Sequence, residues 1–540
     1  MKIAKTGMVT FLMCLPTLLF GGGIVTNSNQ SATYVRMLAR DASTSLDAVY
    51  YNPAGITKLG DGFHLSFNNQ SIFQKKTIEN KFPMLHESKY VGDVAIPLYP
   101  DFYAVYKKNK LAVGFGLTPN AGGGTAKYLT GMPSFEIPVS VIPTSLVANG
   151  IPTTNYSADI NFEGSSVFWG AQVNASYAIN DMISLSAGVR TILARNSYKG
   201  YLKSIMINPN YPSFNMGGHV YNGVMVPATQ FFADGQTYLT GVSTQLNGTA
   251  SSLQPIVAGG AGGVLLSNGT AAGLNATQVA TLQGTITALG GNPANLTIAQ
   301  AQAFFAGASS TYATKATAMG ANSANTVDKD VDAKQTGTGF TPIFGANLTF
   351  GEKLNIGIKY EFNTKLTLTN KTKIDGTGMF PDGAEFRSDI PALLSVGICY
   401  KFLPQLRIST GIHYYFDKNA TIESAPGVKK TIDGNLYELA LGGEYDITEK
   451  ILVSAGYNYS KTGVGQGYQT DISHSLTSNT IGFGFGIKAT EKMMLNFGML
   501  YTMYTGNSKD ISYTSYGVPS AQETYSRTNI VFSIGVDYSF

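Results

Sequence analysis

The chain has 540 residues, of which 13% are charged and 11% aromatic, with 61 glycines and a formal net charge of +4. An average soluble protein carries about 25% charged residues. The low charged fraction argues against a cytosolic enzyme, and the small net charge gives no basis for nucleic-acid binding. Few charges with many aromatic and glycine residues fit a β-sheet with one face in lipid and long loops of small residues.

The first 23 residues have the three parts of a secretory leader. Lys2 and Lys5 form a basic start, an apolar stretch runs from Met8 to Phe20, and three glycines follow. This order predicts a signal peptide over residues 1–23, with cleavage after Gly23. The chain is therefore expected to be exported.

Residues 24–61 do not alternate and are too polar to cross a membrane as a strand. Unpaired backbone groups cannot lie in hydrocarbon. We expect this segment to fold as a plug, or hatch, inside the pore of the barrel that the following residues predict. Its "SATYVRMLARDA" stretch reads as a short helix.

A turn motif closes this segment, formed by Asn52, Pro53, Ala54 and Gly55. Proline fixes φ, asparagine can bond back to the local backbone, and Gly55 can adopt a positive φ. The motif predicts a sharp turn, which is either part of the plug or an ordinary lead into the first strand.

From residue 62 onward, apolar side chains alternate with small or polar ones. In "KLNIGIKYEF", Leu354, Ile356 and Ile358 share one face, and Asn355 and Lys359 share the other. Period two is the signature of a strand. Fourteen such stretches predict an all-β fold, an antiparallel transmembrane β-barrel over residues 62–540: 62–73, 100–107, 110–118, 165–178, 182–196, 340–350, 353–369, 389–402, 405–417, 434–446, 449–461, 477–488, 491–504 and 524–540.

The connections between these stretches alternate between short and long. Short ones such as residues 107–109 and 351–352 are followed by long ones such as 370–388. Bacterial outer-membrane barrels have an even number of strands, short periplasmic turns and longer external loops. The pattern therefore predicts a multi-pass barrel of the bacterial outer membrane with both ends in the periplasm.

The longest connection, at about residues 197–339, is rich in Ala, Gly, Thr and Asn. We expect one large external loop without a core of its own, containing a short helix at "LTIAQAQAFFAG" capped by Asn295 or Thr297. It is either an entry site for a ligand or a surface excursion.

Two features near strand ends carry further expectations. The third stretch ends at Pro119, Asn120, Gly122 and Gly123, which lack a ladder donor or weaken pairing and predict either an inward kink or a frayed end. The chain ends in Phe540 on the lipid-facing register, the usual recognition mark for the outer-membrane assembly machinery.

The stretch "RDASTSLDAVYYNPAGITKLGDGFHLSF" resembles the amino-terminal hatch of the FadL-type family of outer-membrane transporters, which carries an Asn-Pro-Ala motif where Asn52, Pro53 and Ala54 stand. "YPDFYAVYKKNKLAVGFGLTPNAGGGTAKY", "EGSSVFWGAQVNASYAINDMISLSAGVR" and "SDIPALLSVGICYKF" are similar to strands of the same family. The resemblance covers most of the chain except residues 197–339. It implies a hatch-gated barrel that takes up long-chain fatty acids or other lipophiles through an apolar pocket and releases them sideways beside a kink in the third strand.

Alternation directs Arg190, Lys359 and Arg407 into the lumen, with Glu361 close to Lys359. Arg190 stands where the resemblance places a lumenal arginine. These cations are candidate contacts for a ligand carboxylate, or they pair with the hatch and with one another.

Five scattered histidines, with His413 turned into the lumen, predict no catalytic arrangement, metal site or cofactor. The chain is therefore not expected to be an enzyme, and a monomer is the simplest assembly. The competing hypothesis is a surface barrel that acts through its long loops, as an adhesin or a structural protein.

Overall fold

The computed structural model describes residues 27–216 and 218–540. The predicted leader over residues 1–23 and the first residues of the opening segment lie outside this range. Among the described helices, none has both the length and the apolar character that spanning a membrane requires.

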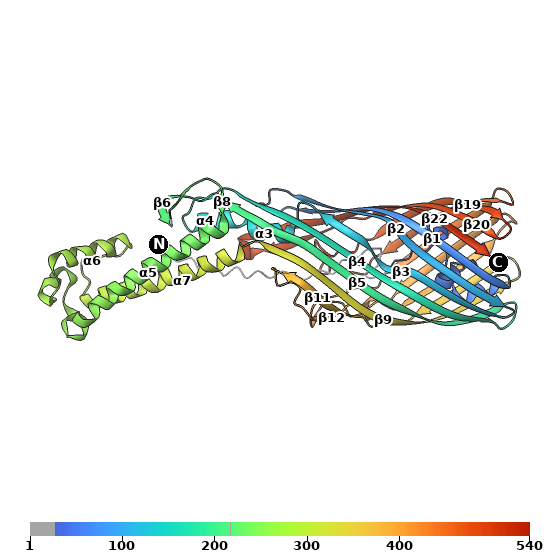
Figure 1. Cartoon of the computed structure of the whole chain (residues 1–540), viewed down its shortest axis with the longest axis horizontal. Coiled ribbons are helices and arrows are strands. Elements are labelled where there is room, and N and C mark those ends of the chain that lie inside the picture. Colours follow the sequence, from blue (N-terminus) through green and yellow to red (C-terminus); the bar gives the residue numbers. More distant parts are fainter. Residues whose placement is uncertain (1–26, 217) are drawn as a thin grey trace. The chain divides into compact units, whose positions relative to one another are not determined.

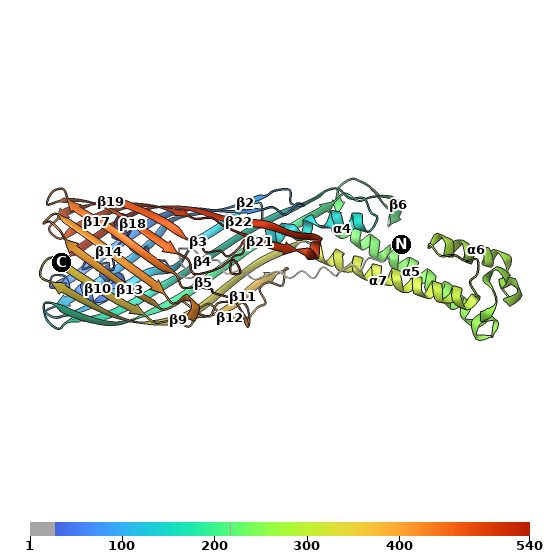
Figure 2. The same ribbon diagram turned by 180° about the vertical axis from the view of Figure 1, so that it is seen from behind.

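Fourteen antiparallel strands of the described chain close into a barrel, as the sequence predicted. Each of these strands pairs with the barrel strand that follows it in the chain, for example β1 with β2, β5 with β9 and β10 with β13. Strand β4 lies beside β5 (Figures 1 and 2). The ring closes where β1 pairs with β22, from His64 opposite Ser539 to Asn80 opposite Glu523. The barrel strands are β1 (Gly62–Asn80), β2 (Lys89–Lys108), β3 (Leu111–Tyr128), β4 (Tyr156–Ala178), β5 (Ile183–Ile207), β9 (Lys329–Phe350), β10 (Leu354–Glu361), β13 (Leu393–Lys401), β14 (Leu406–Tyr415), β17 (Tyr437–Asp446), β18 (Ile451–Lys461), β19 (Ser478–Thr490), β20 (Met493–Tyr504) and β22 (Val518–Ser539).

Shorter elements extend the long-loop end of the sheet. Strand β11 pairs with β9, β12 pairs with β11, and β21 pairs with β22. Their bounds, with those of the neighbouring elements, are α3 (Pro133–Ser140), β11 (Thr367–Asp375), β12 (Glu385–Arg387), η4 (Asp417–Asn419), β15 (Glu423–Ala425), β16 (Val428–Lys429), β21 (Asn507–Tyr513) and η5 (Thr514–Tyr516).

The two faces of the barrel wall differ in polarity as the alternation predicted. Large apolar side chains stand half-exposed on the outside, among them Phe67, Phe344 and Phe532. The side chains between them point inward, where Asn68 and Asn347 are buried. An apolar outer band around a polar interior is the pattern of a barrel whose outside faces lipid.

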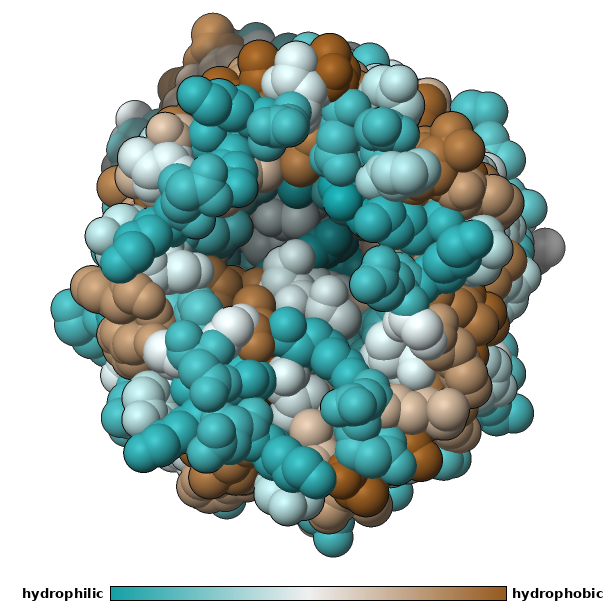
Figure 3. All heavy atoms as spheres, turned by 90° about the vertical axis from the view of Figure 1, so that its right-hand side faces the viewer, coloured by the Kyte–Doolittle hydropathy of each residue, from teal (hydrophilic) through white to brown (hydrophobic). Residues whose placement is uncertain are grey.

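The short connections gather at one end of the barrel, where the chain also ends (Figure 1). Asn109 and Gly351 take left-handed φ angles of 55° and 59° in two of these turns. Asparagine and glycine are the residues that accept this conformation at least cost. Seen from this end, mostly hydrophilic residues surround a hollow (Figure 3).

Residues 139–159 and 203–328 form a second compact unit. The antiparallel helices α5 (Ala228–Ala258) and α7 (Ile298–Asn325) are its longest elements, and hydrogen bonds join Ser243 to Ser309. Its other elements are α4 (Ile142–Ala148), β6 (Asn210–Met216), β7 (His219–Asn222), β8 (Val226–Pro227), η2 (Ala261–Gly263), η3 (Leu266–Ala272) and α6 (Ala276–Ala288).

The expectation of a coreless loop at residues 197–339 is wrong. Strands β5 and β9 extend into this range, and the helices between them bury Leu253, Ile286 and Phe305 in a common cluster. Apolar residues are few here, but they recur at helical spacing, as Ile298, Ala301 and Phe305 do, which is sufficient for a packed face. Helix α7 is also longer than expected, and of the two proposed caps Thr297 serves, accepting the N–H of Gln300 at 3.2 Å.

We predict that the barrel folds without most of this helical unit. Leu202 and Lys329 are opposite each other in the ladder between β5 and β9, so a four-residue Gly-Ser linker can replace residues 203–328 as a hairpin loop. The variant is expected to show the heat-modifiable gel mobility of a closed barrel. A chain that never acquires that mobility would contradict the independence of the two units.

Candidate functional site

Residues 27–57 pack against inward side chains of the barrel strands. The segment contains α1 (Ala32–Arg36), α2 (Ala48–Tyr51) and the short helix η1 (Pro53–Lys58), and every residue from Gln30 to Ser43 is buried. Its polar groups bond to inward side chains from strands all around the wall. The bonds include Arg36 to Asn496 on β20, Asn52 to Asn347 on β9, Thr57 to Ser184 on β5, and Gln172 and Asn174 on β4 to the carbonyl of Val49.

Local capping interactions shape this segment. Ser31 caps α1 through its Oγ, which accepts the N–H of Tyr34 at 2.9 Å. Arg40 donates from Nε and Nη2 to the two carboxylate oxygens of Asp47 at 2.8 and 2.9 Å, and Ser43 adds a hydrogen bond to the same carboxylate. The loop before α2 is thus held by its own charged pair, which leaves Arg36 and Asp41 for bonds to the wall.

The predicted turn motif anchors the segment. Asn52 donates from Nδ2 to the carbonyl of Ser43 at 2.9 Å and to Oδ1 of Asn347 at 2.7 Å. Pro53 and Ala54 begin η1 rather than a sharp turn. The expected positive φ at Gly55 is wrong, because Gly55 is absent from the left-handed residues of the described chain. It is needed for space, since a Cβ there would collide with the carbonyl of Ser43.

Inward glycines of the wall make room for the segment's backbone. A Cβ on Gly482 would lie 2.5 Å from the carbonyl oxygen of Val35, and one on Gly456 would lie 2.6 Å from the amide of Leu38. Gly357 similarly abuts the carbonyl of Asp41. Sequence reasoning recorded these glycines as the small face of the strands but did not connect them with the opening segment.

The predicted cations Arg190 and Lys359 meet at one carboxylate. Arg190 donates to Glu361 at 2.6 and 3.1 Å, and Nε donates to Gln172 at 2.8 Å. Lys359 donates to Glu361 at 2.6 Å and to the carbonyl of Tyr50 at 2.9 Å. Both cations lie 4.7 Å from the centre of the Tyr50 ring, so they contact the opening segment as well as sharing Glu361.

Arg407 belongs to a separate ion-pair group. It lies 2.9 Å from Asp446 and 3.5 Å from Glu444, and Glu444 also pairs with Arg36 of the segment at 2.5 Å. All three predicted cations therefore already have carboxylate partners. Of the two alternatives raised by the sequence, pairing with the plug and with one another matches this geometry.

One contact was missed by sequence reasoning. His413 on β14 lies between two carboxylates, with Nε2 2.6 Å from Asp41 of the segment and Nδ1 2.7 Å from Glu438 of β17. Alternation placed His413 in the lumen, but no local signal pairs it with a residue 372 positions away.

Strand β3 departs from β2 at the predicted kink residues. The ladder between them stops at Leu117 opposite Phe102 and resumes at Ala126 opposite Val94. Against β4, Asn120 and Gly123 are each an extra unpaired residue. Residues 118–123 are buried, and the carbonyl of Pro119 accepts hydrogen bonds from Gln30 and Tyr99. The backbone of β3 therefore leaves the ladder with β2 here and contacts the opening segment.

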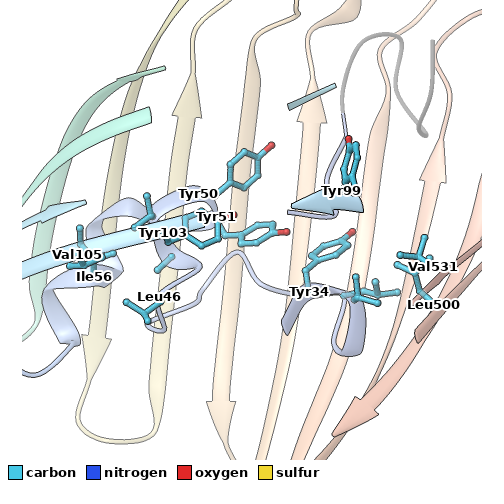
Figure 4. Close-up of a cluster of buried hydrophobic side chains, with 14 of the residues drawn as sticks. Tyr34, Leu46, Tyr50, Tyr51, Ile56, Tyr99, Tyr103, Val105, Leu500 and Val531 are labelled. Atoms are coloured by element: carbon cyan, nitrogen blue, oxygen red, sulfur yellow. The ribbon is translucent and has the colours of Figure 1, made fainter. Parts of the chain in front are cut away.

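An aromatic and aliphatic cluster joins the segment to this part of the wall (Figure 4). Tyr34 and Tyr51 stack with ring centres 5.4 Å apart. Tyr103 of β2 donates to the carbonyl of Gln30 at 2.5 Å.

A second buried group, the apolar lumen cluster, involves Ala121 of the kink. It brings together side chains from β3, β4, β5, the strands of the long-loop end and the outer loops: Ala121, Phe168, Ile192, Ala194, Leu366, Leu368, Phe386, Ile390, Ile422, Val464 and Tyr468. These residues form a buried hydrophobic cluster next to the interrupted ladder.

The final residue, Phe540, stands exposed on the outside of the barrel. Its amide donates to the carbonyl of Phe63 at 2.9 Å, and its ring lies 5.6 Å from that of Phe63. The terminal side chain is thus presented at the barrel edge where β1 and β22 meet.

Two solved structures share this architecture. A crystal structure of a Pseudomonas aeruginosa FadL homologue matches at a TM-score of 0.55 and 13% identity, covering 96% of this chain and 100% of that one. A crystal structure of the Pseudomonas putida toluene transporter TodX matches at 0.51 and 12% identity, with coverage of 96% and 100%. No protein-family model and no curated protein matches the sequence. The chain has the fold of a FadL-type bacterial outer-membrane β-barrel, as the resemblance predicted.

We predict that Gly456→Val displaces the segment and opens the barrel. The added methyl groups would overlap the backbone at Leu38, and overpacking of this kind costs about 1–3 kcal/mol. Single-channel conductance in planar bilayers is expected to rise. The matched control is Gly443→Val, at an outward position where a Cβ would lie 3.7 Å from the carbonyl oxygen of Arg407. Equal conductance for the two variants would contradict the packing of the opening segment against Gly456.

Proposed function

We propose that the protein carries hydrophobic small molecules, with long-chain fatty acids as the substrate class, across the outer membrane. The observation that carries this proposal is the interrupted ladder between β2 and β3, which lies beside the apolar lumen cluster through Ala121. The two structural neighbours described above, a FadL homologue and a toluene transporter, support a lipophilic cargo.

In this proposal the cargo enters from the long-loop end, lies against the apolar lumen cluster and leaves sideways through the gap between β2 and β3. Burying a sixteen-carbon chain yields on the order of 10 kcal/mol at about 0.8 per CH₂. A rigid pocket with that affinity would release its cargo too slowly. A lateral route into lipid solves this, because the chain never has to return to water.

The opening segment acts as the hatch. Gln30 of the segment and Tyr99 of β2 both donate to the carbonyl of Pro119, and Tyr99 accepts from Asn27 of the segment, so the position of the segment is coupled to the shape of the gap. The contacts of Arg190 and Lys359 with Tyr50 and the ion pair of Arg36 with Glu444 keep it seated. Removing one partner from such a buried network costs about 3–5 kcal/mol, so the hatch shifts as a unit rather than losing single contacts.

The lateral exit is tested by deleting Asn120 and Gly123, the two extra residues of β3. Without them β3 can pair continuously with β4 and close against β2. We expect uptake of radiolabelled oleate to fall at least tenfold in a host strain that lacks its own long-chain fatty-acid transporter. Surface abundance and heat-modifiable mobility should stay unchanged.

The matched control is the double substitution Asn120→Ala/Gly123→Ala, which keeps the number of residues and hence the bulges. It should retain most of the uptake. If the deletion variant transports normally with a regular β3, cargo does not leave through this gap.

The second compact unit, residues 139–159 and 203–328, favours a second candidate function, that of a surface protein that acts through this unit. Its support is the compact core around Leu253, Ile286 and Phe305. The variant lacking residues 203–328 separates the two functions. Transport predicts oleate uptake above that of the empty host strain for both the full chain and the variant. The surface function predicts uptake at the level of the empty host strain for both, and loss of binding to cells or matrix in the variant.

A further inference from the structure

Two cations face each other inside the wall on β1 and β22. Lys76 and Arg527 are register partners, and they are 1% and 3% exposed. Both share the inward parity of their strands. Like charges directly opposite each other in a sheet are destabilising.

Arg527 has more hydrogen-bond donors than partners. Nη2 donates to the carbonyl of His474 at 3.2 Å, and the guanidinium lies 5.1 Å from the ring centre of Tyr504. Nε and Nη1 have no hydrogen-bond partner although both are buried. Arginine stays charged in proteins, and leaving such donors unsatisfied costs more than an ordinary lost hydrogen bond.

The acidic groups on the neighbouring segments are engaged elsewhere. Asp471 accepts the amides of Ser134 and Ile472, each at 2.9 Å. Glu523 accepts from Asn80 at 2.7 Å and from the hydroxyl of Tyr525. Within the described chain Arg527 therefore lacks a carboxylate partner, unlike the lumenal arginines at positions 36, 190 and 407.

The loop that contacts Arg527 also contributes to the apolar lumen cluster. The connection between β18 and β19 supplies Val464 and Tyr468 to the apolar lumen cluster and His474 to Arg527. The His474 ring stacks on Tyr525 at 5.0 Å. Burial and the nearby charges of Arg527 and Lys76 lower the pKa of His474 well below its usual value. The imidazole beside Arg527 is therefore uncharged.

We propose that Arg527, supported by Lys76, binds the carboxylate of a long-chain monocarboxylic acid whose hydrocarbon tail lies in the apolar lumen cluster. A carboxylate satisfies the open donors of the guanidinium and separates the two cations electrostatically. The inference rests on the proposed transport function and refines it, because it selects an acid over a neutral hydrocarbon.

The test compares laurate with dodecan-1-ol, which share a chain and differ in the head group, by titration calorimetry on the purified full chain in detergent. Arg527→Gln is expected to weaken laurate binding about 10- to 100-fold, the range for a lost charged hydrogen bond. Dodecan-1-ol binding should stay within twofold. Lys76→Gln should weaken laurate by a smaller factor.

Two controls separate binding from structure. Arg195→Gln removes an exposed arginine of β5 and should leave both affinities unchanged. Ligand-free Arg527→Gln should melt at the same temperature as the parent or higher, since it removes a buried charge without a carboxylate partner; a lower melting temperature would indicate a structural role and overturn the inference.

The remaining outcomes are also decisive. If the parent binds both ligands and Arg527→Gln weakens neither, or both equally, the anion site is wrong while lipophile transport stands. If the parent binds neither ligand, the proposed function itself fails.

Discussion

The structure depends on one close approach, in which the backbone of residues 35–41 lies directly on the inward glycines of the wall. Gly357, Gly456 and Gly482 have no side chain to hold the segment away, so it reaches the strand backbone itself. Polar side chains around this contact then complete the hydrogen bonding of the segment. A barrel with ordinary side chains at these positions would have no space for a folded plug of this size.

Polar and apolar side chains occupy different parts of the lumen, and this division follows from the packing of the segment on the glycines. Carboxylates and cations concentrate where the segment lies, as in the group in which Arg190 and Lys359 both pair with Glu361. Apolar side chains concentrate beyond it, toward the long loops. Charges pair where the backbone of the segment must be held, and apolar side chains fill the region beyond it.

Most of the barrel strands could be predicted because the same period-two alternation of apolar and polar residues runs through them. Alternation over stretches such as Leu354 to Glu361 fixes both the strand and the face of each residue, and it placed Arg190, Lys359 and His413 inward correctly. The partners of those residues could not be predicted. His413 meets Asp41 across 372 positions, and only closure of the ring brings them together.

The failures have distinct physical causes. Gly55 was assigned a positive φ from its turn context, whereas crowding by Ser43 is the reason for glycine there. The helical unit was taken for a loop because small residues dilute its apolar positions below the density of a typical core. The sequence did not single out Arg527, because alternation shows that an arginine points inward but not whether a carboxylate lies beside it.

The placement of the opening segment can be measured directly in native membranes. Thr57 and Ser184 bring their hydroxyl oxygens within 2.8 Å of each other, one from the segment and one from β5. In a Cys399→Ser background, Thr57→Cys/Ser184→Cys should form a disulfide on mild oxidation while the barrel keeps its folded mobility. Two free thiols that react with a water-soluble maleimide in the assembled barrel would show that the segment lies outside the lumen.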